Sequence, residues 1–294
     1  MSATTTRLAE PPPIALTPTR STLTASRAAL RALILRDLTV LKKNFGEFVA
    51  RTLIQPFLLV FVFLYVFPTI GQGIGGSGNP ATESRFATVL VPGVVAISIM
   101  FQGIQAVALQ MSTEFGYTRE IEDRVQAPCP IWLVAIAKVL SGAVQGIIAA
   151  VIVFPIAAVV HAPGVSAHLS VHWPIVLTLI PLASVAMTSL GLVLGTTFEP
   201  RNIGLMFGFV VLPLTFLGGT YYQWTKLAPV ELGTFHWLQV LVLINPLIYI
   251  TEGMRAGLTD ASHMPLYVIY PVLCGFCAVF LGVGLRNFRR RVLV

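Results

Sequence analysis

The sequence predicts an all-α, polytopic membrane protein, and three observations support this fold class. Hydrophobic residues make up 55% of the 294 residues and charged residues only 11%, whereas a soluble domain carries roughly a quarter charged. Between Thr52 and Leu285 the chain is almost a continuous series of apolar runs without Asp, Glu, Lys or Arg. Several runs reach the ~20 residues that a helix needs to cross a ~30 Å hydrocarbon core. The basic residues between the runs are distributed unevenly, which indicates how the chain is oriented in the bilayer.

Six helical spans are expected, joined by polar or Gly- and Pro-rich segments. The first span ends in the stretch GQGIGGSGNP, which is typical of a flexible loop. Lys138 lies near the inner end of the third span, and we expect its long side chain to extend toward the headgroups. The basic segment RNFRRR follows the last span. The predicted spans are 52–70, 87–111, 131–160, 173–197, 203–222 and 266–285.

Two segments precede the first span. Residues 1–25 are rich in Thr, Pro and Ala and lack the apolar stretch of a signal peptide, so we expect a disordered cytoplasmic tail. Residues 26–46 carry apolar side chains such as Leu30, Ile34 and Leu38 at helical spacing, with Arg and Lys between them. This pattern favours an amphipathic helix on an anionic membrane surface over an ordinary solvated helix. Residues 26–294 are expected to form one membrane domain.

The run 232–251 is long enough for a seventh span, but two features argue against one. Asn245-Pro246 interrupts it near its middle, where proline breaks a helix. With six spans, both termini are cytoplasmic and all of the 19 Lys and Arg residues except Arg85, Lys226 and Arg255 lie inside, as the positive-inside rule favours. We therefore predict an external, re-entrant helical hairpin before the last span. The protein is expected in the cell (plasma or inner) membrane.

The cytoplasmic loop between the second and third spans carries the densest charge of the chain. A short charged helix between two spans is a feature that a cytoplasmic partner could grip, and a solvated connector explains the same composition equally well. The charged residues of this candidate partner site are Glu114, Arg119, Glu120, Glu122, Asp123 and Arg124.

Polar side chains within the apolar runs are candidates for the transport path. Ser98, Gln102 and Gln105 share one face of the second span, and they either line a path or bond to a neighbouring helix. Glu252 and Arg255 are spaced i, i+3 and are expected to form a structural pair on one helix face. Close helix packing is expected at three GxxxG pairs, namely Gly142/Gly146, Gly191/Gly195 and Gly204/Gly208.

Motifs for other functions are missing or weak. The sequence has no GxxxxGK[ST] loop, so this chain does not itself bind ATP by a P-loop, and no catalytic residues are assigned. Three histidines in one external loop, His161, His168 and His172, could bind a metal, but solvated histidines are the simpler interpretation and no metal site is assigned. The pair Cys274 and Cys277 is interpreted as small buried apolar residues. The net charge of +7 is explained by basic residues that orient the chain in the membrane, so no nucleic-acid partner is expected.

Two segments resemble one known family. EFGYTREIEDRVQAPCPIWLVAIAKVLSG resembles the cytoplasmic loop of the type-2 ABC exporter permeases, the membrane subunits of daunorubicin-resistance-type and related exporters, and INPLIYITEGMRAGL resembles the external segment before their last span. The resemblance covers about Ser26 to the C-terminus. Its matching positions in the external segment are Asn245, Pro246, Glu252 and Arg255.

The resemblance implies a function and partners. Two such permeases, identical or paralogous, pair in the bilayer, and each docks a separate ATP-binding subunit that holds ATP and Mg. Residues 114–124 would be the coupling helix, and 232–260 would cap the outer end of the path. The substrate would be a drug, a lipid or a lipid-linked glycan moved outward.

Two other classes of function remain as alternatives. An ion-coupled secondary transporter usually has internal repeats and intramembrane carboxylates, and no Asp or Glu lies at mid-depth of a predicted span. An integral membrane enzyme would need an acidic or histidine constellation that the sequence lacks. A neighbouring reading frame for an ATPase with a P-loop would discriminate in favour of the ABC permease.

Overall fold

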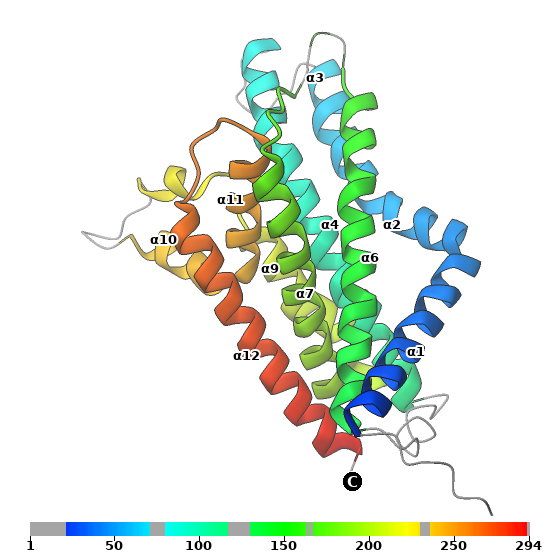
Figure 1. The fold of residues 1–294 in the computed structure, drawn as a ribbon. Coiled ribbons are helices and arrows are strands. Elements are labelled where there is room, and N and C mark those ends of the chain that lie inside the picture. The colour runs from blue at the N-terminus through cyan, green and yellow to red at the C-terminus, as the bar shows by residue number, and fades with distance from the viewer. Residues whose placement is uncertain are drawn as a thin grey trace, which may run out of the picture.

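The computed structural model describes residues 22–70, 80–116, 130–162, 164, 167–229 and 236–292. Within these ranges all regular structure is helical, which confirms the predicted all-α class (Figure 1). Six segments are long and apolar enough to cross a membrane, as predicted. They are Phe45–Thr69, Ala81–Gly116, Ile131–Ile156, Trp173–Thr197, Pro200–Leu217 and Leu266–Val292.

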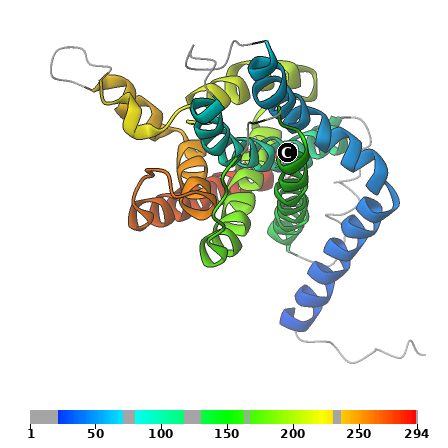
Figure 2. The same cartoon turned by 90° about the horizontal axis from the view of Figure 1, so that it is seen from above.

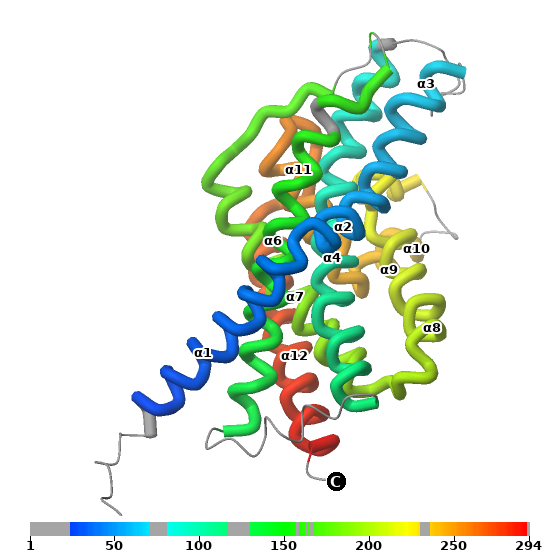
Figure 3. Tube along the Cα trace, turned by 90° about the vertical axis from the view of Figure 1, so that its right-hand side faces the viewer, coloured from blue at the N-terminus to red at the C-terminus, as the bar shows by residue number. Residues whose placement is uncertain are grey.

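The first span joins three helical segments. α1 (Thr22–Lys43) precedes it and projects obliquely from the bundle (Figure 3). Asn44 separates α1 from α2 (Phe45–Val60), which continues through a π-helical turn, η1 (Phe61–Val66), into α3 (Phe67–Thr69). The helix α1 therefore begins before the predicted residue 26, and the first span begins before residue 52. The predicted tail lies outside the described residues up to position 21.

The centre of the bundle is formed by α4 (Pro80–Gly116) and α7 (Trp173–Thr197), which pack against each other over much of their length. On this pair pack α6 (Ile131–Val159) and α12 (Leu266–Val292) (Figures 1 and 2). Because α4 has 37 residues, its length of about 1.5 Å per residue exceeds the hydrocarbon core. It runs beyond the predicted 87–111 at both ends.

The predicted glycine contacts differ in outcome. A Cβ added to Gly191 would lie 2.9 Å from the Ile104 carbonyl oxygen, and one added to Gly195 would lie 2.9 Å from the Ala108 Cα, so α7 approaches the α4 backbone closely. Gly142 and Gly146 of α6 lie similarly close to Thr188 and Ser184 of α7. These two predicted pairs are packing sites. The third pair is not one within the described chain, because nothing lies within 4 Å of a Cβ at Gly204 or Gly208.

The fifth span is short and irregular. It runs through η2 (Pro200–Asn202), α8 (Ile203–Met206), the π-helical η3 (Phe207–Val211) and α9 (Leu212–Leu217) at the edge of the bundle (Figure 3). The prediction that it extends to residue 222 is wrong. Gly218 and Gly219 follow α9, and Gly219 has φ +67°, a conformation that ends a helix. The chain then turns into η4 (Trp224–Leu227).

The interrupted run before the last span forms two helices in place of one. α10 (Trp237–Leu241) and η5 (Val242–Ile244) meet α11 (Pro246–Leu258) at an angle of 95°. The predicted break at Asn245-Pro246 is confirmed. α11 is buried along its whole length and packs on α4, α7 and α12. The helix that follows the bend therefore lies against protein. Interrupted helical backbone is tolerated at membrane depth in such surroundings.

Candidate functional site

The bend before α11 is stabilised by the side chain of Asn245. Its Oδ1 accepts a hydrogen bond from the Leu247 N–H at 2.9 Å, which caps the helix. Its Nδ2 donates to the Leu214 carbonyl oxygen at 2.7 Å, which ties the bend to α9 of the fifth span. Pro246 occupies the first helical position, where its missing N–H costs no hydrogen bond. The cap is a local contact, whereas the bond to the fifth span is tertiary.

Glu252 and Arg255 form the predicted pair, with Arg255 Nη1 donating to Glu252 Oε1 at 2.7 Å. Both side chains are fully buried. Glu252 also accepts hydrogen bonds from the backbone N–H groups of Trp224 at 2.9 Å and Met264 at 3.0 Å. A carboxylate with three donors is satisfied inside the protein, so this pair is structural.

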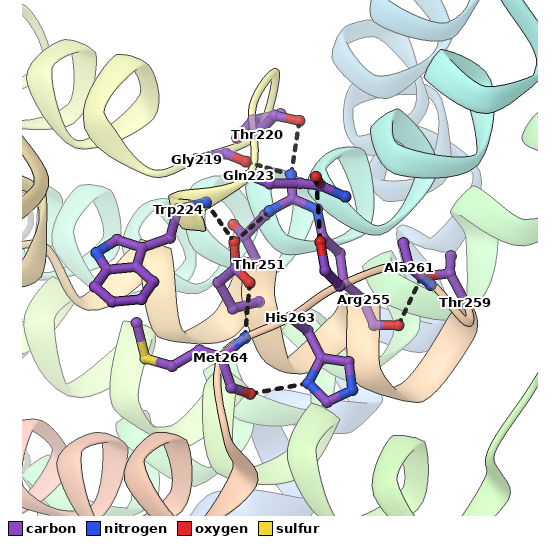
Figure 4. A network of polar contacts seen from close by, with 12 residues as sticks. Gly219, Thr220, Gln223, Trp224, Thr251, Arg255, Thr259, Ala261, His263 and Met264 are labelled. Atoms are coloured by element: carbon purple, nitrogen blue, oxygen red, sulfur yellow. Dashed lines mark hydrogen bonds and ion pairs between the residues drawn. The ribbon is translucent and has the colours of Figure 1, made fainter. Parts of the chain in front are cut away.

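The guanidinium of Arg255 extends the network to the end of the fifth span. Its Nη2 donates to the carbonyl oxygens of Gly219 and Thr220 (Figure 4). Together the pair connects α11 with the turn after α9, with η4 and with the segment leading into α12. A Cβ added to Gly93 of α4 would lie 2.5 Å from the Thr220 carbonyl oxygen, so α4 touches the same turn.

Near the C-terminal end of α4, Lys138 of α6 forms a buried ion cluster. Its Nζ lies 2.7 Å from Glu114 Oε1 and 3.8 Å from Asp37 Oδ2, and its side chain is only 2% exposed. The expectation that Lys138 extends toward the headgroups is therefore wrong. Its ammonium finds two carboxylates within the bundle, which satisfies a buried charge better than a partial approach to water. Asp37 was not singled out from the sequence, because nothing local connects it to two residues that lie far along the chain.

This cluster lies where α4 and α6 flank the charged segment between them. Glu114 lies in the last turn of α4, and Lys138 lies in the third turn of α6. Asp37 attaches both to α1. The other charged residues of the predicted partner site fall in 117–129, outside the described residues. They are Arg119, Glu120, Glu122, Asp123 and Arg124.

The polar residues of the second span bond largely within the bundle. Gln102 is buried, accepts a hydrogen bond from Thr52 Oγ1 of α2 at 3.0 Å and donates to Gln145 Oε1 of α6 at 3.1 Å. Ser98 donates to the Val94 carbonyl oxygen of its own helix at 2.8 Å. Of the two interpretations offered by the sequence, contact with neighbouring helices holds for Gln102. The partners Thr52 and Gln145 were missed, although an amide or hydroxyl in an apolar run is itself a signal.

Gln105 lies one turn closer to the C-terminal end of α4 and lines a cavity of about 600 Å³. The cavity lies between α1, α2, α4 and α6. Its lining is mixed, with charged and amide groups such as Arg51, Glu47 and Gln110 beside apolar groups such as Phe48 and Leu109. Such a lining suits a molecule with a polar end and an apolar end.

The three histidines between the third and fourth spans do not form a metal site in the part of the chain that the structure describes. No three His, Cys, Asp or Glu side chains of those residues gather closely enough to hold an ion. The His161 ring lies 3.3 Å from the Ala162 carbonyl oxygen. His168 is fixed through its backbone N–H, which donates to Thr88 Oγ1.

Comparison with known proteins identifies the family. Residues 28–259 match the family model described as ABC-2 type transporter. The chain belongs to the ABC-2 type transporter family. It is 28% identical over 236 residues to proteins named Inner membrane transport permease YadH from Escherichia coli K12, Escherichia coli O157:H7 and Shigella flexneri, covering 78% of this chain and 84% of each relative.

Family and fold agree on the general function. This ABC-2 family member is a multi-pass membrane protein and a membrane transport subunit. The Lys138 cluster lies at the C-terminal end of α4, and the Glu252–Arg255 network lies beside the N-terminal half of the same helix.

Proposed function

We propose that this permease forms the membrane path of an ATP-driven exporter. A separate ATP-binding subunit would hold ATP and Mg and dock on the loop 114–124, and a second permease copy or a paralogue would complete the path. Both termini would be cytoplasmic, in line with the distribution of Lys and Arg. The substrate would be hydrophobic or amphipathic: a drug, a lipid or a lipid-linked glycan.

The observation that carries this proposal is the buried cluster of Lys138 with Glu114 and Asp37. It joins the two ends of the proposed docking loop to each other and to α1. A force applied to the loop by a partner would therefore move α4, α6 and α1 together. An exposed ion pair couples two helices weakly because water and salt screen its charges. Separating a buried pair without a substitute partner costs several kcal/mol, so the two helices move together.

The continuous helix α4 provides a route to the external end. Its C-terminal end carries Glu114, and in its other half Gly93 touches the Thr220 turn that Arg255 holds. Movement of the loop would thus reach the network under the re-entrant segment without crossing a flexible joint. In this mechanism the bent segment 237–258 opens and closes the outer end of the path.

The mixed lining of the cavity beside Gln105 supports the proposed class of substrate. Charged groups of α1 and α2 would receive a polar headgroup, and the apolar groups would receive a lipophilic part. The cavity lies on the α1 side of the bundle, where a molecule from the cytoplasmic leaflet would enter.

The test is transport by the reconstituted complex. The permease is coexpressed with a P-loop ATPase encoded by a neighbouring reading frame. The complex is reconstituted in proteoliposomes and given a panel of fluorescent lipids and lipophilic drugs. We expect at least one substrate to move in an ATP-dependent manner and to stimulate hydrolysis. A complex whose ATPase lacks its P-loop lysine is the control. Transport driven by an ion gradient without ATP would overturn the proposal.

A further inference from the structure

A second polar site lies on the cytoplasmic end of the bundle, away from the cavity described above. It is a groove of about 790 Å³ between the first turn of α6 and the last turns of α12, two helices that contact each other. In Figure 1 the lower ends of these helices converge. The groove is lined by Pro130, Ile131, Trp132, Leu285, Arg286, Arg289 and Arg290.

The groove carries three positive charges and no negative one. Arg286, Arg289 and Arg290 are spaced i, i+3 and i+4 and therefore share one face of α12. All three are exposed, and none forms an ion pair with an acidic residue in the described part of the chain. Three guanidinium groups at this spacing repel one another unless an anion lies between them.

The next arginine shows a different arrangement. Arg291 Nη1 donates to the carbonyl oxygens of Gly195, Thr196 and Phe198, each at 3.1 Å, where α7 ends. Its guanidinium carbon also lies 4.6 Å from the centre of the Phe115 ring. Arg291 is thus used inside the protein to cap a helix C-terminus. The three arginines of the groove have no such internal role.

The apolar side of the groove continues into the membrane. Trp132 is 52% exposed, and an exposed indole at the end of a span is typical of the membrane interface. Ile136 and Leu140 follow it at intervals of four along α6, and Leu140 is exposed. On α12, Gly282 and Val279 follow Arg286 along one face, and both are exposed. Nothing lies within 4 Å of a Cβ at Gly282, so this face is open.

We propose that this groove binds one anionic phospholipid of the cytoplasmic leaflet, with its phosphate between the three arginines and its acyl chains along α6 and α12. Basic pockets between spans on the cytoplasmic side are suited to anionic headgroups, and arginine binds phosphate in bidentate geometry. A soluble partner would explain the arginines but not the apolar faces that run on toward the centre of the bilayer. The inference rests on the cytoplasmic orientation in the proposed function.

The test measures lipid binding to the full-length permease, purified together with any subunit that accompanies it. Native mass spectrometry during titration with phosphatidylglycerol or phosphatidylcholine gives the Kd of each lipid. The site variant is R286Q/R289Q/R290Q. The matched control is R85Q/R201Q/K226Q, which removes three charges from exposed positions outside the groove and outside α1. A third variant, R286K/R289K/R290K, keeps the charge and guards against loss of folding or altered insertion.

We expect phosphatidylglycerol to bind the native protein at least about tenfold more tightly than phosphatidylcholine, because each basic residue near the surface contributes about 1 kcal/mol. The site variant should lose most of this preference, while the matched control and the lysine variant keep it. Equal losses in the site variant and the matched control would show general surface attraction and overturn the proposal. Normal lipid preference in the site variant, with or without loss of the ATP-binding subunit, would also overturn it. ATP-driven transport is measured separately, so its failure would not be confused with failure of lipid binding.

Discussion

Lys138 Nζ lies 2.7 Å from Glu114 Oε1, although the two residues are 24 positions apart and belong to different spans. Both are buried, so this ion pair holds α4 and α6 together at the point where each meets the loop between them. A buried pair contributes little net stability compared with apolar residues, but removing one partner leaves an uncompensated charge. The pair therefore specifies that the C-terminal end of α4 packs beside the N-terminal part of α6.

Replacing Lys138 with Met should destabilise the permease by roughly 3–5 kcal/mol, because the carboxylates of Glu114 and Asp37 would lose their buried counter-charge. The triple variant K138M/E114Q/D37N should recover much of the stability but not substrate-stimulated ATP hydrolysis. Thermal unfolding in detergent and ATPase assays of the reconstituted complex measure the two effects. Normal coupling in the stable triple variant would remove this cluster from the mechanism.

Replacing Glu252 with Gln should impair export more than insertion, because Arg255 would lose its counter-charge at a fully buried position. We expect a loss of stability of a few kcal/mol, since the Trp224 and Met264 N–H groups also lose a charged acceptor. Glu199→Gln, which breaks an exposed pair with Arg201, is the matched control and should cost less than about 1 kcal/mol. Equal effects of the two variants on unfolding would contradict the structural role of the Glu252 network.

Replacing Gly191 with Ala should cost roughly 1–3 kcal/mol, because the added Cβ would lie 2.9 Å from the Ile104 carbonyl oxygen and force α4 and α7 apart. Gly208→Ala is the control, since open space surrounds that position. Unfolding of the isolated permease should distinguish the two. If Gly208→Ala instead reduces assembly without lowering the stability of the single chain, that face contacts another chain.

The bent segment before α12 should enter and leave the membrane on the same side. Single cysteines at His236 and Ser262, both outside α10 and α11, should react with an impermeant reagent from outside intact cells. Ser262 is chosen because it is exposed, whereas the nearer Thr259 is buried. A cysteine at the exposed Thr197 should react only after permeabilisation. Reaction of His236 and Ser262 from opposite sides would make the segment a seventh span and reverse the placement of one terminus.

Several features of this protein could be predicted because their causes are local. The number of spans follows from the length of apolar runs, and the break at Asn245-Pro246 follows from proline chemistry. The Glu252–Arg255 pair follows from i, i+3 spacing on one helix. The identity of the family could be recognised because its two motifs each occupy a continuous stretch of sequence.

Other features depend on which helices meet, and the sequence by itself does not state that. Lys138 could extend to the headgroups or bind a carboxylate, and only the packing of α1, α4 and α6 brings Asp37 and Glu114 to it. The same holds for Gln102, whose partners Thr52 and Gln145 come from two other spans. In a bilayer nearly every face of these spans is apolar, so hydrophobicity places a helix in the membrane without choosing its neighbours. The sequence thus determined the spans and the break between them, whereas close packing and buried polar bonds decided how they assemble.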